Sequence, residues 1–215
     1  KRVKTSIAAT VLAALLSVNA AAREPFPDPA VDDRAAKGTQ TAVFSGGCFW
    51  CTEAVFEQLA GVKNVVSGYG GGKREQAHYE IVSAGGTDHA ESIQVTFDPA
   101  KITYGQLLKV FFHVAHDPTQ LNRQGPDYGK QYRSAIFYAN AEQKRIAEAY
   151  IKQLTDAKVF GKPIVTQVSE LKAFYPAEEY HQDFVKRNPA HPYVVVNAQP
   201  KIQKTRQEFP ELLKK

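Results

Sequence analysis

The feature that most constrains this chain is the segment Gly46-Gly47-Cys48-Phe49-Trp50-Cys51, which contains both cysteines and the single tryptophan. A strand-like run, residues 41–45, leads into it, and a helix-like run, residues 52–59, leads out of it. The two glycines let the backbone turn tightly at this junction and leave the following residues accessible. Cys48 is therefore expected at a helix N-terminus, where the macrodipole favours the thiolate over the thiol. The pattern predicts a nucleophilic sulfur beside two aromatic rings, with a second sulfur three residues further on.

The spacing of the two cysteines favours redox chemistry. Residues i and i+3 of a helix have Cβ atoms about 5–6 Å apart, so a Cys48–Cys51 disulfide needs only modest local adjustment. A bridge over so short a loop constrains the unfolded chain little, which makes an inert structural disulfide the weaker interpretation. Structural zinc usually takes four ligands, and nothing places any of the six histidines near the cysteines. We expect no metal and no bound cofactor.

Two other segments resemble known motifs only in part. The glycine-rich run 67–73 lacks the spacing of a phosphate loop and the third glycine of a dinucleotide fingerprint, so it is interpreted as the flexible rim of a binding site. No dense stripe of Lys and Arg follows the chain, which argues against nucleic-acid binding.

The first 22 residues have the pattern of a secretory signal peptide. Lys1, Arg2 and Lys4 precede an apolar run, residues 7–16, that is too short to span a bilayer, and a small-residue cleavage site ends at Ala22. Cleavage there would remove three of the 27 basic residues and lower the formal net charge from +5 to +2. No later stretch is apolar for long enough to cross a membrane. The expectation is an exported monomer, periplasmic if the source is a Gram-negative bacterium.

The rest of the chain predicts one α+β domain, a two-layer sandwich with a mixed sheet. Residues 23–39 are expected to be a mobile lead-in and residues 193–215 a polar C-terminal tail. Strands and helices are mixed along residues 40–192 without a strict βαβ rhythm. The expected strands are 41–45, 62–66, 79–83, 91–97, 132–138 and 163–168, and the expected helices are 49–60, 104–115, 141–157 and 177–186.

Several polar residues mean little when each is taken alone. Glu91 opens an alternating strand at an end where its side chain could face a cleft, but a solvated carboxylate is the simpler interpretation. Tyr79 and Tyr132 are typical of half-buried strand packing. Asp127 follows Gly125-Pro126 and fits a turn.

Taken together, these segments resemble the A-type peptide methionine sulfoxide reductases over roughly residues 40–192. The resemblance implies a catalytic domain with a ferredoxin-like core. The matching motifs, in order, are Gly46-Gly-Cys-Phe-Trp50, Gly68-Tyr-Gly-Gly71, Gly86-Thr-Asp-His-Ala-Glu91, Phe97-Asp-Pro99, His116-Asp-Pro-Thr-Gln120, Asp127-Tyr-Gly-Lys-Gln-Tyr-Arg-Ser134 and Phe174-Tyr-Pro-Ala-Glu-Glu-Tyr-His-Gln182.

The resemblance also implies a role for each residue of the site. Cys48 would attack the sulfoxide sulfur, and Glu91, kept protonated in a partly apolar pocket, would protonate the leaving oxygen. Methionine would then leave, with Cys48 as a sulfenic acid. By position, Phe49 and Trp50 match the pocket for the substrate methyl group, Tyr79 and Tyr132 match hydroxyls that bind the sulfoxide oxygen, and Asp127 matches a substrate-binding carboxylate.

Cys51 is where the chain departs from much of that family. Many members have glycine at this position and a resolving cysteine in the C-terminal tail, whereas residues 188–215 contain no cysteine. The resemblance therefore implies a Cys48–Cys51 disulfide, reduced by an external thioredoxin-like dithiol. The implied substrate is the S-epimer of methionine sulfoxide, free or in proteins.

Two interpretations from other classes remain open at this point. A thioredoxin-like disulfide oxidoreductase also has Cys-x-x-Cys at a helix start, although bulky Phe49 and Trp50 suit a pocket better than an exchange surface. A non-enzymatic binding protein for methionine-rich partners could use the same aromatic rings as an anchor.

Overall fold

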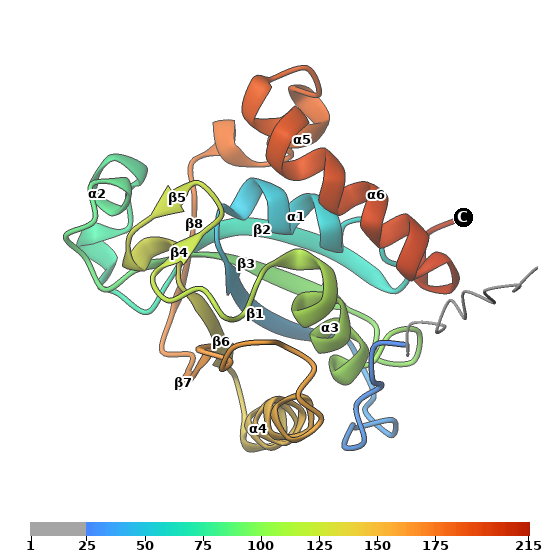
Figure 1. Cartoon of the computed structure of the whole chain (residues 1–215). Helices are drawn as coiled ribbons and strands as arrows, with labels where there is room; N and C mark the ends of the chain where they lie inside the picture. Colours follow the sequence, from blue (N-terminus) through green and yellow to red (C-terminus); the bar gives the residue numbers. More distant parts are fainter. Residues whose placement is uncertain (1–24) are drawn as a thin grey trace, which may run out of the picture.

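The computed structural model describes residues 25–215, which form a six-stranded sheet, a separate two-stranded hairpin and a set of helices (Figure 1). The expected signal peptide, residues 1–22, lies outside the described residues. The strands are β1 (Gln40–Gly46), β2 (Val62–Gly70), β3 (Ala90–Phe97), β4 (Arg123–Gln124), β5 (Asp127–Tyr128), β6 (Ser134–Tyr138), β7 (Gln167–Glu170) and β8 (Phe174–Pro176). The α-helices are α1 (Phe49–Phe56), α2 (Tyr79–Ser83), α3 (Tyr104–Val110), α4 (Ala141–Asp156), α5 (Phe184–Arg187) and α6 (Gln199–Glu208).

Within residues 25–215, six short 3-10 or π segments complete the helical structure. Their bounds are η1 (Arg74–Gln76), η2 (Phe111–Ala115), η3 (Lys130–Tyr132), η4 (Glu179–His181), η5 (Val194–Ala198) and η6 (Pro210–Leu212). None of the helices described is long and apolar enough to cross a membrane.

The central strands have the ferredoxin-like order. Along the sheet the strands run β7-β6-β1-β3-β2-β8. The pairs β6–β1, β1–β3 and β3–β2 are antiparallel, and α1 connects β1 to β2 while α3 lies between β3 and β6 in the chain. β7 pairs parallel with β6, which makes the sheet mixed. The predicted α+β fold with a ferredoxin-like core is confirmed.

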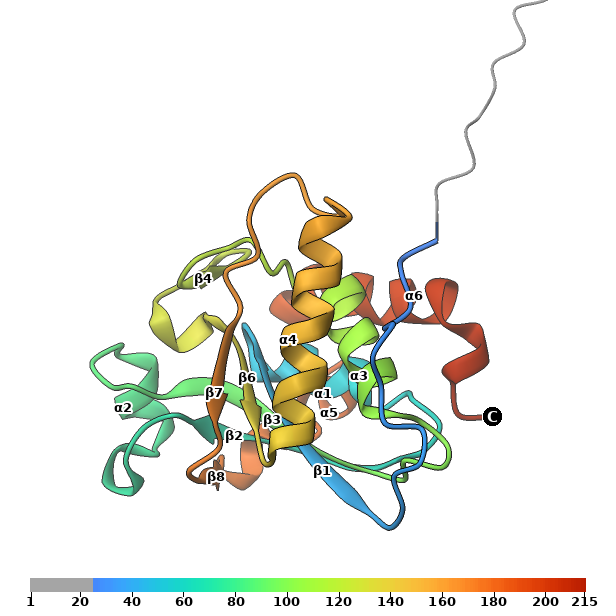
Figure 2. The same ribbon diagram turned by 90° about the horizontal axis from the view of Figure 1, so that it is seen from below.

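Alternation along the strands divides the sheet into a helix-covered face and a second face. Phe44 of β1 points to the helices, where its ring stacks with Phe56 at 5.5 Å and with Phe111 at 5.1 Å between centroids. The next residue back, Val43, points to the other face and belongs to a smaller cluster with Phe137. Figure 2 shows α3 and α4 side by side, and both contribute to the main core.

Several expected elements differ in extent or type. Residues 79–83 form helix α2 rather than a strand. The last expected strand, 163–168, lies instead at β7, and the expected helix 177–186 is divided into η4 and α5. β2 continues through the glycine-rich run as far as Gly70, because β8 pairs with it there. This close pairing leaves no room for a Cβ at Gly68, which explains the glycine.

Both ends of the described chain pack against the domain. In the segment before β1, Asp32 accepts hydrogen bonds from Thr103 and from the Gly105 N–H at the start of α3. The Tyr150 hydroxyl on α4 donates to the Pro27 carbonyl at 2.6 Å. The segment expected to be a polar tail forms η5 and α6, which lie beside α1 (Figure 1).

Candidate active site

The site begins at the turn between β1 and α1, where the backbone needs glycine. Gly47 has a φ of +86°, in the left-handed region that other residues rarely adopt. A Cβ on Gly47 would lie 2.5 Å from Cβ and Cγ of Gln124, on β4. The turn therefore requires a residue with no side chain, and the β4–β5 hairpin lies directly against it.

Gly47→Ala is accordingly expected to destabilise the fold by about 1–3 kcal/mol and to displace the hairpin. Urea unfolding of the variant measures the loss. Gly161→Ala is the matched control, because Gly161 lacks a positive φ and has no atom within 4 Å of its added Cβ. Equal stability of the two variants would show that the turn tolerates a side chain.

Cys48 and Cys51 occupy the start of α1 and are both buried. Cys48 is the N-cap residue, 8% exposed, and Cys51 in the first turn is 1% exposed. Burial raises the pKa of the Cys48 thiol well above its usual value, and hydrogen bonding to Cys51 raises it further. The expectation that the helix N-terminus would favour the Cys48 thiolate is wrong, because burial outweighs that effect. The helix has only eight residues, and its first N–H is already bonded to a carboxyl group.

That carboxyl group belongs to Glu91. Glu91 shares the helix-facing side of β3 with Ile93, so its side chain projects beneath the start of α1. Its Oε2 accepts a hydrogen bond of 3.0 Å from the backbone N–H of Phe49, the residue next to Cys48. Glu91 is 3% exposed, and burial raises its pKa to about 8 even though this hydrogen bond lowers it. At neutral pH the side chain is therefore largely a neutral acid beside the Cys48 thiol.

Trp50 is held by contacts on its edge and on one face. Its Nε1–H donates to Nδ1 of His181 at 3.0 Å, and its ring stacks on Phe184 with centroids 3.8 Å apart. Burial lowers the pKa of His181, which keeps the imidazole neutral and able to accept. The Phe49 ring lies 5.1 Å from the same imidazole, so His181 contacts both predicted pocket residues.

The two tyrosines lie near Cys48 and Glu91, and Asp127 lies near Cys51 and Glu91. Burial raises the pKa of Tyr79 and of Tyr132, and Glu91 and Cys48, when they are ionised, raise both further. Both phenols therefore lie within electrostatic range of the two reactive groups. Asp127 is on the β4–β5 hairpin, where burial raises its pKa and a hydrogen bond from Tyr193 lowers it. The structure thus brings all eight predicted site residues together.

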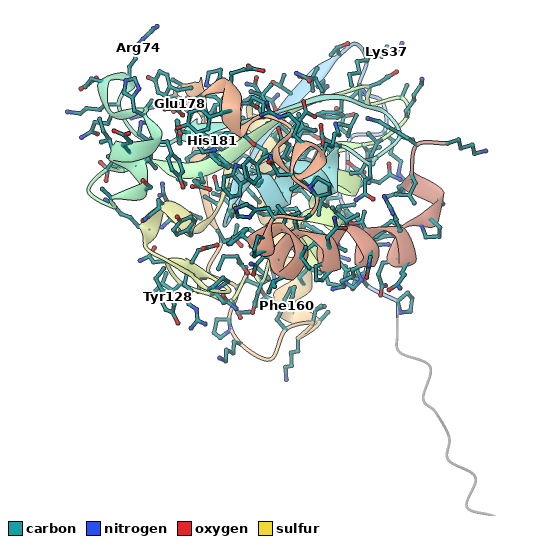
Figure 3. The ribbon with its side chains drawn as sticks, turned by 90° about the horizontal axis from the view of Figure 1, so that it is seen from above. Lys37, Arg74, Tyr128, Phe160, Glu178 and His181 are labelled. Atoms are coloured by element: carbon teal, nitrogen blue, oxygen red, sulfur yellow. The ribbon has the colours of Figure 1, made fainter. Side chains whose placement is uncertain are left out.

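Three positioning groups were not identified from the sequence. The Tyr193 hydroxyl donates to Oδ2 of Asp127 at 2.5 Å, and Tyr193 slightly lowers the pKa of both cysteines. Glu178 accepts from the Tyr69 hydroxyl at 2.8 Å and from the Tyr79 N–H at 2.9 Å, which ties α2 to the sheet. His181 is the third. Figure 3 shows Glu178 and His181 near α2, with Tyr128 marking the β4–β5 hairpin. Glu178 and His181 lie within the matching motif at residues 174–182, but their partners are brought near them only by the fold.

Other candidate sites are weaker. Among the described residues, no group of three His, Cys, Asp or Glu side chains could hold a metal ion. A surface hollow of about 490 Å³ is lined by Leu154, Phe160 and Ile164, and Figure 3 labels Phe160. It contains no cysteine, histidine or carboxylate, so its lining offers no comparable chemistry.

A buried thiol, a second thiol three residues on and a protonated carboxyl define a thiol-based oxidoreductase. The family model described as peptide methionine sulfoxide reductase matches residues 40–213. Peptide methionine sulfoxide reductase MsrA 2 of Synechocystis sp. is 58% identical over 193 residues, covering 88% of this chain and 90% of the relative. MsrA 2 of Mesorhizobium japonicum is 56% identical, covering 85% and 93%.

Solved structures of the same kind share the fold. Mxr1 from Saccharomyces cerevisiae in reduced form superposes with a TM-score of 0.64 at 33% identity, covering 71% of this chain and 87% of the other. Methionine sulfoxide reductase A of Corynebacterium diphtheriae gives 0.63 at 34% identity, covering 74% and 79%. The chain belongs to the peptide methionine sulfoxide reductase family. It is a thiol-dependent peptide-methionine (S)-S-oxide reductase, so the thioredoxin-like and purely binding alternatives are excluded.

Proposed function

We propose that this chain reduces the S-epimer of methionine sulfoxide through a Cys48 sulfenic acid and a Cys48–Cys51 disulfide. The observation that carries the proposal is the hydrogen bond from the Phe49 N–H to Glu91, which holds a buried acid against the residue that follows Cys48. The first turn of α1 therefore places the Cys48 nucleophile and, through this hydrogen bond, the Glu91 proton donor side by side.

In the first step Cys48 attacks the sulfoxide sulfur as a thiolate. Oε2 of Glu91 accepts the Phe49 N–H, which leaves Oε1 to carry the proton toward the sulfoxide oxygen. The oxygen passes to the Cys48 sulfur and methionine leaves, so the substrate sulfur is reduced and Cys48 is oxidised to the sulfenic acid. Burial raises the pKa of Cys48, so the thiolate forms only when the thiol proton is released to solvent, while Glu91 keeps its own proton for the sulfoxide oxygen.

Tyr79 and Tyr132 would stabilise the negative charge that develops on the sulfoxide oxygen. Their raised pKa values keep both phenols protonated and able to donate. On the opposite side of the substrate, the rings of Phe49 and Trp50 would hold the S-methyl group by packing and sulfur–aromatic contact. Fixed positions for the oxygen and the methyl group together select one epimer. Asp127 would be a further substrate-binding group.

In the second step the Cys51 sulfur attacks the Cys48 sulfenic acid and displaces its oxygen as water. Cys51 supplies the only other thiol in the chain. The disulfide then exchanges with an external dithiol, for which a thioredoxin-like protein is the proposed donor, so the cycle needs no bound cofactor. The proposed substrates are free methionine sulfoxide and sulfoxide residues in other proteins.

We infer the place of action from the N-terminal residues alone. Lys1, Arg2 and Lys4 before an apolar run support export, so that the enzyme would repair oxidised exported proteins. Cell fractionation of the full chain tests this: recovery with the exported fraction, shortened near Ala22, is expected, and recovery of the unshortened chain in the cytosol would contradict it.

The activity is tested by supplying each epimer of N-acetyl methionine sulfoxide amide separately with dithiothreitol. The S-epimer is expected to be converted and the R-epimer left unchanged. Cys48→Ser should abolish the reaction, because a neutral hydroxyl is a far weaker nucleophile than a thiolate. Conversion of the R-epimer, or activity that survives Cys48→Ser, would contradict the proposal.

A further inference from the structure

Helix α6 and the π-helical turn η5 cover the second cysteine. Cys51 belongs to a buried cluster that includes Ala198, at the end of η5, and Ile202, on α6. Figure 1 shows α6 beside α1 along this contact. Lys201 lies three residues after Ala198, on the same face of the helix. The chain segment that follows the sequence motifs therefore brings a cation to the side of α1 where Cys51 lies.

Lys201 is anchored at a defined point. Its Nζ donates a hydrogen bond of 2.7 Å to the carbonyl of Ala115, the last residue of η2. Carbonyl groups at a helix C-terminus favour a positive charge. One turn further along α6, Nζ of Lys204 makes the same kind of bond, 2.6 Å long, to the His113 carbonyl. The two lysines thus attach α6 to η2 in the same way.

The charge of Lys201 reaches the active site. The groups that influence Cys51 are Cys48 on the same helix, Tyr193 and Lys201 from the C-terminal segment, and Asp127 from the hairpin. Cys51 in turn acts on Glu91. A hydrogen bond from Cys48 lowers the pKa of Cys51, the Lys201 ammonium lowers it further, and burial opposes both. In this group Lys201 is the one cation, and the Asp127 carboxylate opposes its effect on Cys51.

We propose that Lys201 is a positioning residue for the resolving step: anchored on α6 beside the Cys51 side of α1, its ammonium group favours the Cys51 thiolate that attacks the sulfenic acid of Cys48. The proposal rests on the Cys48–Cys51 disulfide of the proposed function. The Cys51 thiolate attacks the sulfenic sulfur, the S–S bond forms and the S–O bond breaks, and the hydroxide takes a proton and leaves as water. The Cys51 sulfur is oxidised and the Cys48 sulfur is reduced, so no further oxidant is needed. Only the thiolate attacks, so a nearby positive charge that favours the ionised Cys51 sulfur speeds this step.

The test compares Lys201→Met, Lys201→Arg and Lys204→Met in single turnover with S-methionine sulfoxide and no reductant. Acid quenching and mass spectrometry give the rates of methionine release and of disulfide formation separately. Lys201→Met is expected to slow disulfide formation about tenfold at pH 7 and to move its pH midpoint upward, because a smaller fraction of the Cys51 sulfur is then ionised. Methionine release should keep its rate. Lys201→Arg should restore the resolving rate, and Lys204→Met should leave it unchanged.

Two results would overturn the role of Lys201 alone. One is normal disulfide formation, with an unmoved pH midpoint, in Lys201→Met. The other is equal slowing in Lys201→Met and Lys204→Met, which would show that docking of α6, rather than the charge near Cys51, sets the rate. A wild-type chain that reduces sulfoxide but forms no internal disulfide would overturn this role together with the proposed resolving step, while leaving the reductase activity in place.

Discussion

Glu91→Gln is expected to slow sulfoxide reduction by about 10²–10⁴-fold, the usual contribution of a positioned general acid. The amide can still accept the Phe49 N–H, so the start of α1 keeps its bond, but the amide cannot supply a proton to the sulfoxide oxygen. Single-turnover release of methionine measures the loss without interference from the recycling steps. Release at the wild-type rate would show that the proton comes from another group.

The pH profile of the same pair of proteins identifies the acid. The reactive state has one proton shared between the Cys48 sulfur and the Glu91 carboxyl, with that proton on Glu91. The rate in the wild type should therefore rise toward pH 8, where Glu91 titrates, and fall when the second proton is lost at higher pH. In Glu91→Gln the alkaline fall should disappear. An uncharged substrate such as N-acetyl methionine sulfoxide amide keeps substrate titration out of the profile.

Glu91→Gln, which slows the reaction, should make the protein less sensitive to high pH. Because the folded-state pKa of Glu91 is raised, the folded chain binds more protons than the unfolded chain between pH 4.5 and about 8, and stability falls as the pH rises through that range. The loss amounts to about 5 kcal/mol at most. Glu91→Gln should lose less stability than the wild type between pH 5 and 9 in urea unfolding.

Glu53→Gln is the matched control for Glu91→Gln. Glu53 lies on α1, is 2% exposed, and burial raises its pKa to about 8 as well. Its titration should therefore change stability in the same pH window, while its substitution leaves the rate of sulfoxide reduction unchanged. Equal loss of activity in both variants would indicate damage to α1 rather than loss of an acid.

Cys51→Ser is the second substitution with a large expected effect. The variant should release one methionine per chain at the normal rate and then stop, because no thiol is left to attack the sulfenic acid. Repeated turnover with thioredoxin should fall by about 100-fold or more, since an intramolecular thiol acts at a very high effective concentration. Dithiothreitol should restore part of the turnover, because it can attack the sulfenic acid directly.

The control for this variant is Ala54→Ser, which adds a hydroxyl to the same buried cluster but removes no thiol. It should turn over repeatedly with thioredoxin. Undiminished turnover of Cys51→Ser would show that the reductant attacks the sulfenic acid itself and that Cys51 has no part in the cycle.

Local features of the sequence predicted the part of the site around Cys48. A strand, two glycines and a helix follow one another within residues 41–56, so their order alone places the sulfur at the turn. The position of Glu91 beneath that turn depends on pairing between β1 and β3, across 42 residues of chain. The residue type and the matching motif indicated Glu91, but its burial and raised pKa come from the fold.

Tertiary contacts explain the clearest error in secondary structure. Residues 79–83 include Tyr, Ile and Val, which favour a strand in isolation. In the fold, Glu178 accepts the Tyr79 N–H at the first residue of α2, and Val82 is the one residue of that helix buried in the core. The partner comes from 99 residues further along the chain, so the local pattern contained no sign of it.

The C-terminal segment was the largest omission. Residues 193–215 are polar and contain no cysteine, which predicted a tail. The structure shows instead that Tyr193 bonds Asp127 and that Lys201 lies close enough to influence Cys51. The direction of the Cys48 pKa shift was predicted wrongly for the same reason. The residues of η5 and α6 that bury the Cys48 sulfur, and so raise its pKa, belong to this segment.

The most direct measurement is mass spectrometry of the chain after one turnover of S-methionine sulfoxide without reductant. We expect one methionine released per chain and a chain lighter by two hydrogen atoms, with the loss mapped to the peptide that contains Cys48 and Cys51. A chain that instead gains one oxygen at Cys48, with Cys51 still open to alkylation, would contradict this expectation.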